Sequence, residues 1–458
     1  MKRRLIRWLG YFDSARTIHA IVIAGLAVRL AEIAAFSRLG LRGDDTIYDG
    51  FARALLHHGT LDPLGPPGVA FYLEFFYRIF GASTDVARIC ILLFYPAFAY
   101  LLYALIKRLS NRKAANLMVL FFSLSPSYLF LSIEPITEMP ATVLLLVATG
   151  LLLRLSRRAT WGDLTLLGAD LGFLTLTRPS CMLLVIAVPI YLWVRTRRPW
   201  FSVMPLLLAG LLVGLWIVRL YQRTGHFLMI NYSSTQNVFL GNNRYTPLYA
   251  TWWFASHTEG ELGVPEGFVK MYRKILHQPW FVQNTLYRQI AVRSILSRPD
   301  LFLVRTFSRL RVYFAFDSYL GSLLLNRYDQ SRVLAFLAIA GDAFFYCTVM
   351  LLAILFLFTL TKESERAKPA LMITGISVLY AVPYWLSVSH PIYHFPVIPL
   401  FGILGAMLLG DLMERPVRLV LQPLYSSATR RRWLAVSLVV FAYIQVEFAR
   451  FMYIYSNH

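Results

Sequence analysis

Two adjacent carboxylates, Asp44 and Asp45, stand in the stretch RGDDTIY at residues 42–48, directly after the first long apolar segment. An acidic pair at the mouth of a membrane helix is costly unless it is solvated, paired or used. Because neighbouring carboxylates repel and burial raises the pKa of a carboxyl group, one of the two could act as a base. A cap for a helix that starts near Thr46 is an equally good interpretation, since Asp binds free N–H groups and offsets the helix dipole.

A second acidic pair stands in the tight link 132–138, which carries Glu134 and Glu138 between two apolar segments. So few residues separate the two segments that both acids must lie at the membrane surface, on the same side as Asp44. Glu138 could also cap the helix that follows. Two acidic sites that converge from different links are a more specific signal of an active site than either alone.

Cations and histidines are expected on the same side. Arg178 stands at the break Thr177-Arg178-Pro179 and Arg219 at the end of a later segment. Arginine suits phosphate contacts, although for a single Arg simple snorkelling to the interface is the plainer interpretation. His390 and His394 in the link 389–394 could bind phosphate or metal, or could be ordinary loop histidines. A carboxylate that accepts a hydroxyl proton and cations that hold a departing phosphate would together suit group transfer.

The composition predicts a membrane protein. The chain has 458 residues, of which 57% are hydrophobic and only 15% are charged, whereas soluble domains are about 45–50% apolar and about 25% charged. Apolar runs of about 18–25 residues indicate an all-α polytopic membrane protein with about eleven spans. We expect these spans at 17–37, 86–106, 114–132, 138–153, 162–177, 180–194, 201–219, 333–360, 369–388, 392–412 and 433–452.

The net charge of +21 comes from 45 Lys+Arg against 24 Asp+Glu. Such a basic chain could bind nucleic acid, but its cations cluster in every second link, which is the positive-inside pattern of membrane proteins. The clusters are 2–4, 107–113, 154–158, 195–198, 362–368 and 430–432. We therefore expect no nucleic-acid partner, membrane lipids as partners, a cytoplasmic N-terminus and an outer C-terminus. The three cysteines lie in apolar segments and predict neither disulfides nor a zinc site.

Three regions follow from these spans. Residues 1–219 form an N-terminal transmembrane module whose first outer loop, 38–85, carries an amphipathic helix at 48–58 and a short aromatic helix at 71–80. Residues 220–332 form a larger outer loop region, with Trp252-Trp253 and basic amphipathic helices from 265 to 316. Residues 333–458 form the C-terminal transmembrane helices. Arg29 and Glu32, three residues apart in the first span, predict a buried ion pair.

The order of these motifs along the chain, and their expected position on one side of the membrane, resemble those of the membrane glycosyltransferases of the C superfamily. The resemblance covers most of the chain and is closest to the branch of protein O-mannosyltransferases and lipid A aminoarabinose transferases, glycosyltransferase family 39. The residues that carry it are Arg29, Asp44-Asp45, Tyr48, Pro66-Pro67, Arg88, Thr137-Glu138, Leu176-Thr177-Arg178-Pro179, Arg219, Gly241-Asn242-Asn243 and His390-Pro391 with Tyr393.

The resemblance implies an inverting transfer of a sugar from a polyprenyl phosphate to a hydroxyl group of a lipid, glycan or protein acceptor. Asp44 would be the base and Asp45 its support, and Glu138, or else Glu134, would be the second acidic group, which orients the acceptor or binds a metal. Arg178 and Arg219 would hold the donor phosphate. Tyr48, Glu134, His390, Tyr393 and His394 are further candidates for substrate binding. A divalent metal is possible, and no other cofactor is implied.

Two positions depart from the family pattern. The second acid of the first pair is often Glu and is Asp45 here, and Ile392 stands where an Arg usually precedes Tyr393. If that Arg normally contacts phosphate, His390, His394 or another Arg must replace it.

A transporter or flippase for a lipid-linked substrate is the alternative. It predicts charges near the bilayer midplane and internal repeat symmetry. The acids of this chain instead gather at one face, and no repeat is evident. We therefore expect an enzyme with its active site on the outer face of a bacterial plasma membrane, since the long luminal insertions of the eukaryotic mannosyltransferases are absent.

Overall fold

The computed structural model describes residues 10–37, 40–248, 264–326, 328, 330–361 and 363–456, and these residues form helices and no strands. The first half contains α2 (Thr17–Phe36), α3 (Asp44–His58), α4 (Gly68–Phe80), α5 (Thr84–Leu92), α6 (Phe94–Leu109), α7 (Arg112–Leu124), α8 (Pro126–Phe130), α9 (Glu138–Leu155), α10 (Trp161–Thr177), η1 (Pro179–Cys181), α11 (Met182–Thr196) and α12 (Pro199–Thr224). The second half contains α13 (Ser233–Gly241), α15 (Glu266–Leu276), α16 (Trp280–Ser297), α17 (Pro299–Tyr313), α18 (Tyr319–Asn326), α19 (Arg332–Thr359), α20 (Ala367–Leu386), η2 (Pro391–Val397), α21 (Ile398–Glu414), α22 (Val417–Val420), α23 (Gln422–Tyr425) and α24 (Ala428–Ser456). The basic cluster 2–4 and Trp252-Trp253 lie outside the described residues.

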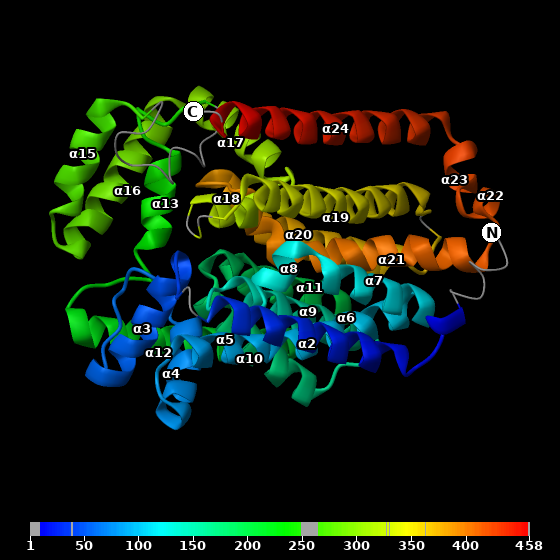
Figure 1. Cartoon of the computed structure of the whole chain (residues 1–458), viewed down its shortest axis with the longest axis horizontal. Helices are drawn as coiled ribbons and strands as arrows, with labels where there is room; N and C mark the ends of the chain where they lie inside the picture. The colour runs from blue at the N-terminus through cyan, green and yellow to red at the C-terminus, as the bar shows by residue number, and fades with distance from the viewer. Residues whose placement is uncertain are drawn as a thin grey trace.

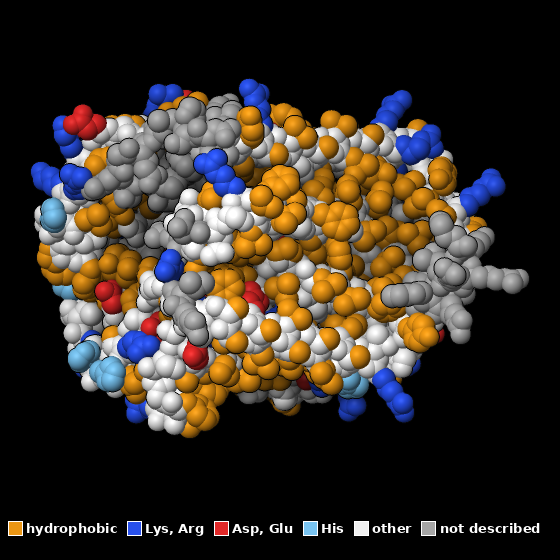
Figure 2. Space-filling model, in the orientation of Figure 1, with side chains coloured by type: hydrophobic (Ala, Val, Ile, Leu, Met, Phe, Trp, Pro, Cys, Tyr) orange, Lys and Arg blue, Asp and Glu red, His pale blue; other side chains and the backbone are white. Residues whose placement is uncertain are grey.

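The all-α membrane fold is confirmed, with nine segments of the described chain long and apolar enough to cross a bilayer. They are 17–36, 84–109, 138–155, 179–196, 199–224, 332–359, 367–386, 391–414 and 428–453. The two other expected spans are helical but shorter, because α7 has 13 residues and α10 has 17. Figure 2 shows hydrophobic side chains over the middle of one face, with most Lys and Arg side chains toward its ends.

Proline determines where two of the expected spans break. The prediction of one span over 114–132 is wrong, because α7 ends at Leu124, Ser125 is extended and α8 begins at Pro126. Proline lacks an N–H group and disfavours a helical residue before it, which accounts for the break. The break predicted at Thr177-Arg178-Pro179 is confirmed, with α10 ending at Thr177 and Arg178 extended before η1.

The basic links meet at one end of the helical bundle, which we call the basic end. Arg154 in the last turn of α9 pairs with Asp163 of α10 at 3.0 Å, and Asn111 before α7 donates to Glu414 at 2.7 Å. Arg366 before α20 pairs with Asp411 of α21. Two of these contacts, Asn111 with Glu414 and Arg366 with Asp411, join links that are far apart in the sequence.

The other end, which we call the site end, carries the helices of the two long non-spanning segments. Figure 1 shows α3, α4, α13, α15 and α16 gathered there. A separate hydrophobic cluster ties them to the span α12: Trp216 packs on Phe71 of α4 with ring centres 5.6 Å apart, and Phe239 of α13 packs on Tyr287 of α16 at 4.9 Å. The expected helices in 48–58, 71–80 and 265–316 are thus present as α3, α4 and α15 to α17.

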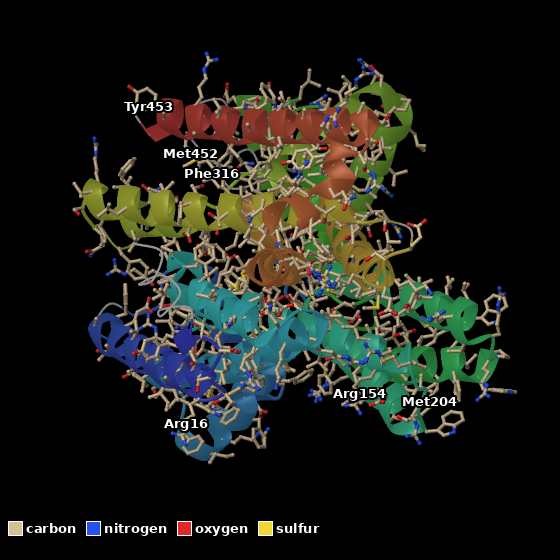
Figure 3. The ribbon with its side chains drawn as sticks, turned by 90° about the vertical axis from the view of Figure 1, so that its right-hand side faces the viewer. Arg16, Arg154, Met204, Phe316, Met452 and Tyr453 are labelled. Carbon is tan, nitrogen blue, oxygen red and sulfur yellow. The ribbon has the colours of Figure 1, made fainter. Side chains whose placement is uncertain are left out.

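The long C-terminal helix α24 packs along α19 and holds the linker between α17 and α18. Gln445 of α24 accepts from the Phe316 amide and donates to the Phe314 carbonyl, both at 2.8 Å. Figure 3 shows Phe316 and Met452 side by side under α24. Because this linker leads directly into Tyr319, the last span supports the site end.

Gly241 at the end of α13 provides a test of the packing at the site end. A Cβ there would lie 1.8 Å from the backbone oxygen of Ser387, and the fully buried Arg309 donates to the Gly241 carbonyl at 3.1 Å. We expect Gly241→Ala to destabilise the protein by about 1–3 kcal/mol, because overpacking forces the backbone apart. Thermal unfolding in detergent measures it, with Gly210→Ala as the control, since that position has open space. Equal stability of the two variants would contradict this packing.

Candidate active site

The acidic pair lies in the first turn of α3. Gly43 is the N-cap and makes no side-chain cap bond, so neither Asp44 nor Asp45 caps the helix. The helix also begins two residues before Thr46. Two carboxylates in the first turn still interact favourably with the helix dipole. The capping interpretation is therefore wrong in its geometry and correct in its electrostatics.

The two aspartates differ sharply in environment. Asp45 is 5% exposed, and its carboxylate accepts from the amides of Arg42 at 3.0 Å and Thr46 at 2.9 Å. It faces a crevice of only about 10 Å³ that also touches Glu134, which is room for about one water. Asp44 is exposed and lines an open pocket of about 540 Å³ together with Arg42 and Asn326. A substrate can therefore approach Asp44 and not Asp45.

Glu134 is buried behind Asp45 and pairs with Arg88 of α5. The guanidinium lies 3.3 Å from Glu134 Oε1 and is fully buried. Arg88 also donates to the carbonyls of Phe36 at 2.9 Å and Gly40 at 3.0 Å. One arginine thus fixes both the link that carries Glu134 and the chain that leads from α2 to the acidic pair.

Glu138 at the start of α9 pairs with Arg178, with a distance of 2.9 Å between Oε1 and Nη1. Both side chains are buried, at 9% and 7% exposed. Arg178 also donates to Thr137 Oγ1 at 3.2 Å and to the Tyr384 hydroxyl at 2.7 Å. The two residues predicted from separate links therefore meet directly.

Tyrosine hydroxyl groups join the acidic pair of α3 to Glu138. Burial and then the charges of Glu138 and Asp44 raise the pKa of Tyr48, and burial and then the charges of Asp44 and Glu138 raise the pKa of Tyr319. Both carboxylates therefore act on the same two phenols, which stay protonated and can donate hydrogen bonds. The predicted convergence of Asp44, Tyr48 and Glu138 at one place is present in the structure.

The link before α21 contributes His390 and Tyr393. Tyr393 stacks on Tyr384 with ring centres 4.7 Å apart, and its ring lies 5.9 Å from the guanidinium carbon of Arg178. His390 lies 6.3 Å from the ring of Tyr319 and accepts from the Ile392 amide through Nδ1. Burial lowers the pKa of His390 to about 3, so that its imidazole is neutral. His390 therefore cannot supply a positive charge for a phosphate.

Two predicted residues lie apart from this group. His394 is buried against Tyr346, with stacked rings 4.6 Å apart, and its Nδ1 lies 2.7 Å from the Tyr313 carbonyl oxygen. Arg219 is exposed and donates to the carbonyl of Gly59 at 3.4 Å, just beyond the C-terminus of α3. Asp44 is at the opposite end of that 15-residue helix, a separation of about 20 Å.

Sequence reasoning missed Tyr319 and Tyr384, which come from regions without a polar motif. It also gave no role to Arg42, although this residue stands beside the acidic pair. The predicted ion pair of Arg29 with Glu32 is not formed: Arg29 donates instead to Ser132 Oγ at 2.6 Å and to the Tyr128 carbonyl at 3.0 Å. The prediction from helical spacing is therefore wrong here, because Arg29 has hydrogen-bond partners in the segment 126–132, which packs against its helix.

No group of three or more His, Cys, Asp or Glu side chains in the described part of the chain is arranged to hold a metal ion. The residues present therefore do not match a conventional metal centre, and no step proposed below is routed through a metal.

The Glu138–Arg178 pair provides a stability test. We expect Arg178→Met to cost about 3–5 kcal/mol, because it leaves a buried carboxylate without its cation. The double variant Arg178→Met/Glu138→Gln should recover part of this loss. The exposed pair Arg298–Asp300 is the control, with both side chains 59% exposed, and Arg298→Met should leave the stability almost unchanged. Chemical unfolding of the four proteins decides, and equal losses for the two single variants would contradict the burial argument.

The family described as dolichyl-phosphate-mannose-protein mannosyltransferase matches residues 65–221, and no curated protein matches the chain. The crystal structure of ArnT from Cupriavidus metallidurans bound to undecaprenyl phosphate shares 13% identity and a TM-score of 0.42, covering 87% of this chain and 78% of that one.

The oligosaccharyltransferase AglB from Archaeoglobus fulgidus, in complex with an inhibitory peptide and a dolichol-phosphate, shares 12% identity and a TM-score of 0.50. The match covers 94% of this chain and 55% of that one, so the chain spans about half the length of the archaeal protein. At this identity the likeness concerns the fold alone. The family match over residues 65–221 and the likeness in fold make this chain similar to the membrane glycosyltransferases of the C superfamily.

Proposed function

We propose that the protein is an inverting glycosyltransferase that moves a sugar from a polyprenyl-phosphate donor to an acceptor hydroxyl, with Asp44 as the general base. The observation that carries the proposal is the exposure of Asp44 in an open pocket beside Arg42, while its neighbour Asp45 is buried and bonded. The family match and the lipid phosphates named for the two similar structures support a lipid-linked donor. The sugar stays open, and a lipid, glycan or protein can supply the hydroxyl.

Asp44 suits the proton transfer that such a reaction needs. Its carboxylate accepts the acceptor's hydroxyl proton as the oxygen forms a bond to the anomeric carbon of the sugar. The bond from that carbon to the phosphate oxygen breaks, and its electron pair leaves with the polyprenyl phosphate. Attack opposite the leaving group inverts the anomeric centre. Phosphate is a good leaving group, so no protonating acid is required.

Arg42 is the cation that we assign to the departing phosphate. It is exposed, lines the same open pocket as Asp44, and stands two residues before it. Guanidinium groups bind phosphate oxygens in a bidentate manner and offset the charge that develops on them. Arg178 is less suited because its charge is already neutralised by Glu138, and Arg219 is less suited because it contacts the far end of α3.

Glu138 and Arg178 then serve as a rigid wall of the site. Their pair, with Thr137 and Tyr384, holds Tyr393 and the link before α9 in position. Tyr48 and Tyr319 offer hydroxyl groups next to Asp44 that can donate to the sugar or the acceptor. We infer that these residues orient the acceptor, and that Glu138 and Arg178 keep their charges throughout the reaction.

The charge pattern supports an active site on the non-cytoplasmic face. Lys and Arg clusters mark cytoplasmic links in membrane proteins, and those of this chain gather at the basic end. The candidate site acids Asp44, Asp45, Glu134 and Glu138 lie at the site end, which would then face outward. We propose a bacterial plasma membrane as the location, because the sequence lacks the long luminal insertions of the eukaryotic mannosyltransferases.

The first functional prediction concerns Asp44. Asp44→Asn should leave the fold intact and lower sugar transfer by about 10²–10⁴-fold, because it removes the general base. Release of radiolabelled sugar from a panel of undecaprenyl-phosphate sugars in membranes measures transfer. Asp85→Asn is the matched control, since Asp85 is also an exposed acid in a first helical turn. Wild-type transfer by the Asp44→Asn protein would refute the assignment, and movement of the donor across the membrane without transfer would favour a flippase.

The second prediction separates the candidate phosphate-binding arginines. Arg42→Ala should raise the KM for the donor by about 10–100-fold, the loss expected for charge-assisted hydrogen bonds. Arg219→Ala should change it less than threefold, because that side chain contacts only a backbone carbonyl beyond α3. Donor titrations at saturating acceptor compare the two. The reverse order would assign the phosphate to Arg219.

A further inference from the structure

Glu134 is the buried acid that the proposed reaction does not use. It is 2% exposed and lies in the link before α9. One oxygen, Oε1, lies 3.3 Å from Arg88, while the other, Oε2, has no hydrogen-bond partner if both Glu134 and Asp45 are charged. Buried polar atoms are normally paired, so an unpaired carboxylate oxygen requires an explanation.

The side chain that Glu134 faces is Asp45. Both carboxyl groups line the same narrow crevice with Tyr319 and Tyr328, and the two acids are within hydrogen-bond range of each other. Two carboxylates in contact cannot both stay ionised, so one must hold a proton. Each oxygen of Asp45 already accepts a backbone amide, whereas the Oε2 of Glu134 has no partner and gains one if it carries a proton. The proton therefore belongs on Glu134.

Resting on the proposed function, we propose that Glu134 is a neutral, proton-loaded positioning residue: its carboxylic O–H donates to Asp45 and thereby fixes the first turn of α3, where Asp44 acts as base. Asp45 then has three donors, from Arg42, Thr46 and Glu134. Arg88 holds Glu134 from the other side and also fixes the chain before α3. The result is a continuous network from α5 to the turn that presents Asp44.

The proton should be lost only at alkaline pH. Burial is the main cause that raises the pKa of Glu134 to about 9. The charge of Arg88 opposes this shift, and the hydrogen bond and charge of Asp45 add to it. The other titratable groups that face it are Arg42, Tyr319 and Tyr328, and Glu32 lies on the far side of Arg88. Tyr319 and Tyr328 both have a raised pKa, chiefly through burial, so neither competes for the titration. Loss of the Glu134 proton would place two negatively charged carboxylates, Glu134 and Asp45, in contact, and their repulsion would loosen the first turn of α3.

The sign of the stability effect follows from this shift. An acid whose pKa is higher in the folded than in the unfolded protein binds its proton more tightly when folded. The stability that Glu134 contributes is therefore fully present below its ordinary pKa of 4.5, falls as the pH rises from there, and reaches its lowest level above about 9. A glutamine at this position cannot titrate, and its amide can donate to Asp45 and accept from Arg88.

The experiment compares wild type, Glu134→Gln and Glu134→Leu between pH 5 and 10. Thermal unfolding in detergent is the first measurement, because it needs no substrate. We expect the Tm of Glu134→Gln minus that of wild type to grow steadily up to about pH 9. Glu266→Gln is the control, since Glu266 is 80% exposed, and its Tm should follow wild type at every pH.

Sugar transfer is the second measurement. Wild type should lose activity reversibly above about pH 9, Glu134→Gln should keep transfer without this alkaline loss, and Glu134→Leu should lose about 10²-fold at all pH values, because misplacing the base by about 1 Å costs that much. Parallel curves of Tm against pH for wild type and Glu134→Gln would refute the proposal that Glu134 is protonated in the folded protein. If the Tm curves diverge but none of the three proteins transfers sugar, the protonation of Glu134 is supported and the proposed function is refuted.

Discussion

A charge buried at the edge of a membrane must be neutralised where it stands, and the site end of this protein is built around that constraint. The link between α8 and α9 withdraws two glutamates from water. Each takes an arginine from a different part of the bundle: Arg88 of α5 for Glu134, and Arg178, which follows α10, for Glu138. The Glu138–Arg178 ion pair, together with the contacts of Arg88 to Glu134 and to two backbone carbonyls, fixes the relative positions of helices that hydrophobic packing alone would leave free to slide.

The same constraint explains why two neighbouring aspartates differ so much. Successive residues of a helix point in directions about 100° apart. Once Arg88 and Glu134 hold the chain before α3, Asp45 must face inward and Asp44 outward. The inward carboxylate accepts hydrogen bonds from two backbone amides, whereas the outward one lines a pocket that a substrate can enter. A preorganised base requires both, because a side chain that is held by its neighbours loses little entropy when the reaction begins.

Hydropathy alone located the spanning helices, since apolar runs and basic links are local properties of the sequence. The positions of Glu138, Arg178 and Asp44 on one end also followed from counting spans. The partners did not, because Arg178 finds Glu138 across 40 residues and Arg88 finds Glu134 across 46. Such pairs depend on which helices pack together. For the same reason Arg29 took Ser132 and Tyr128 as partners although Glu32 was three residues away. The family resemblance pointed to Arg88 without revealing what it binds.

The candidate site draws residues from all three regions into which the sequence was divided. The N-terminal module supplies the acids and arginines, but Tyr319 comes from α18 and Tyr393 from the link before α21. The linker into α18 is held by Gln445 of the last helix, more than a hundred residues further along. The first loop therefore carries Asp44, which we propose as the base, but it does not form the site by itself. The surroundings of Asp44 therefore depend on the packing of the last span, through the linker that leads into Tyr319, as well as on the first loop.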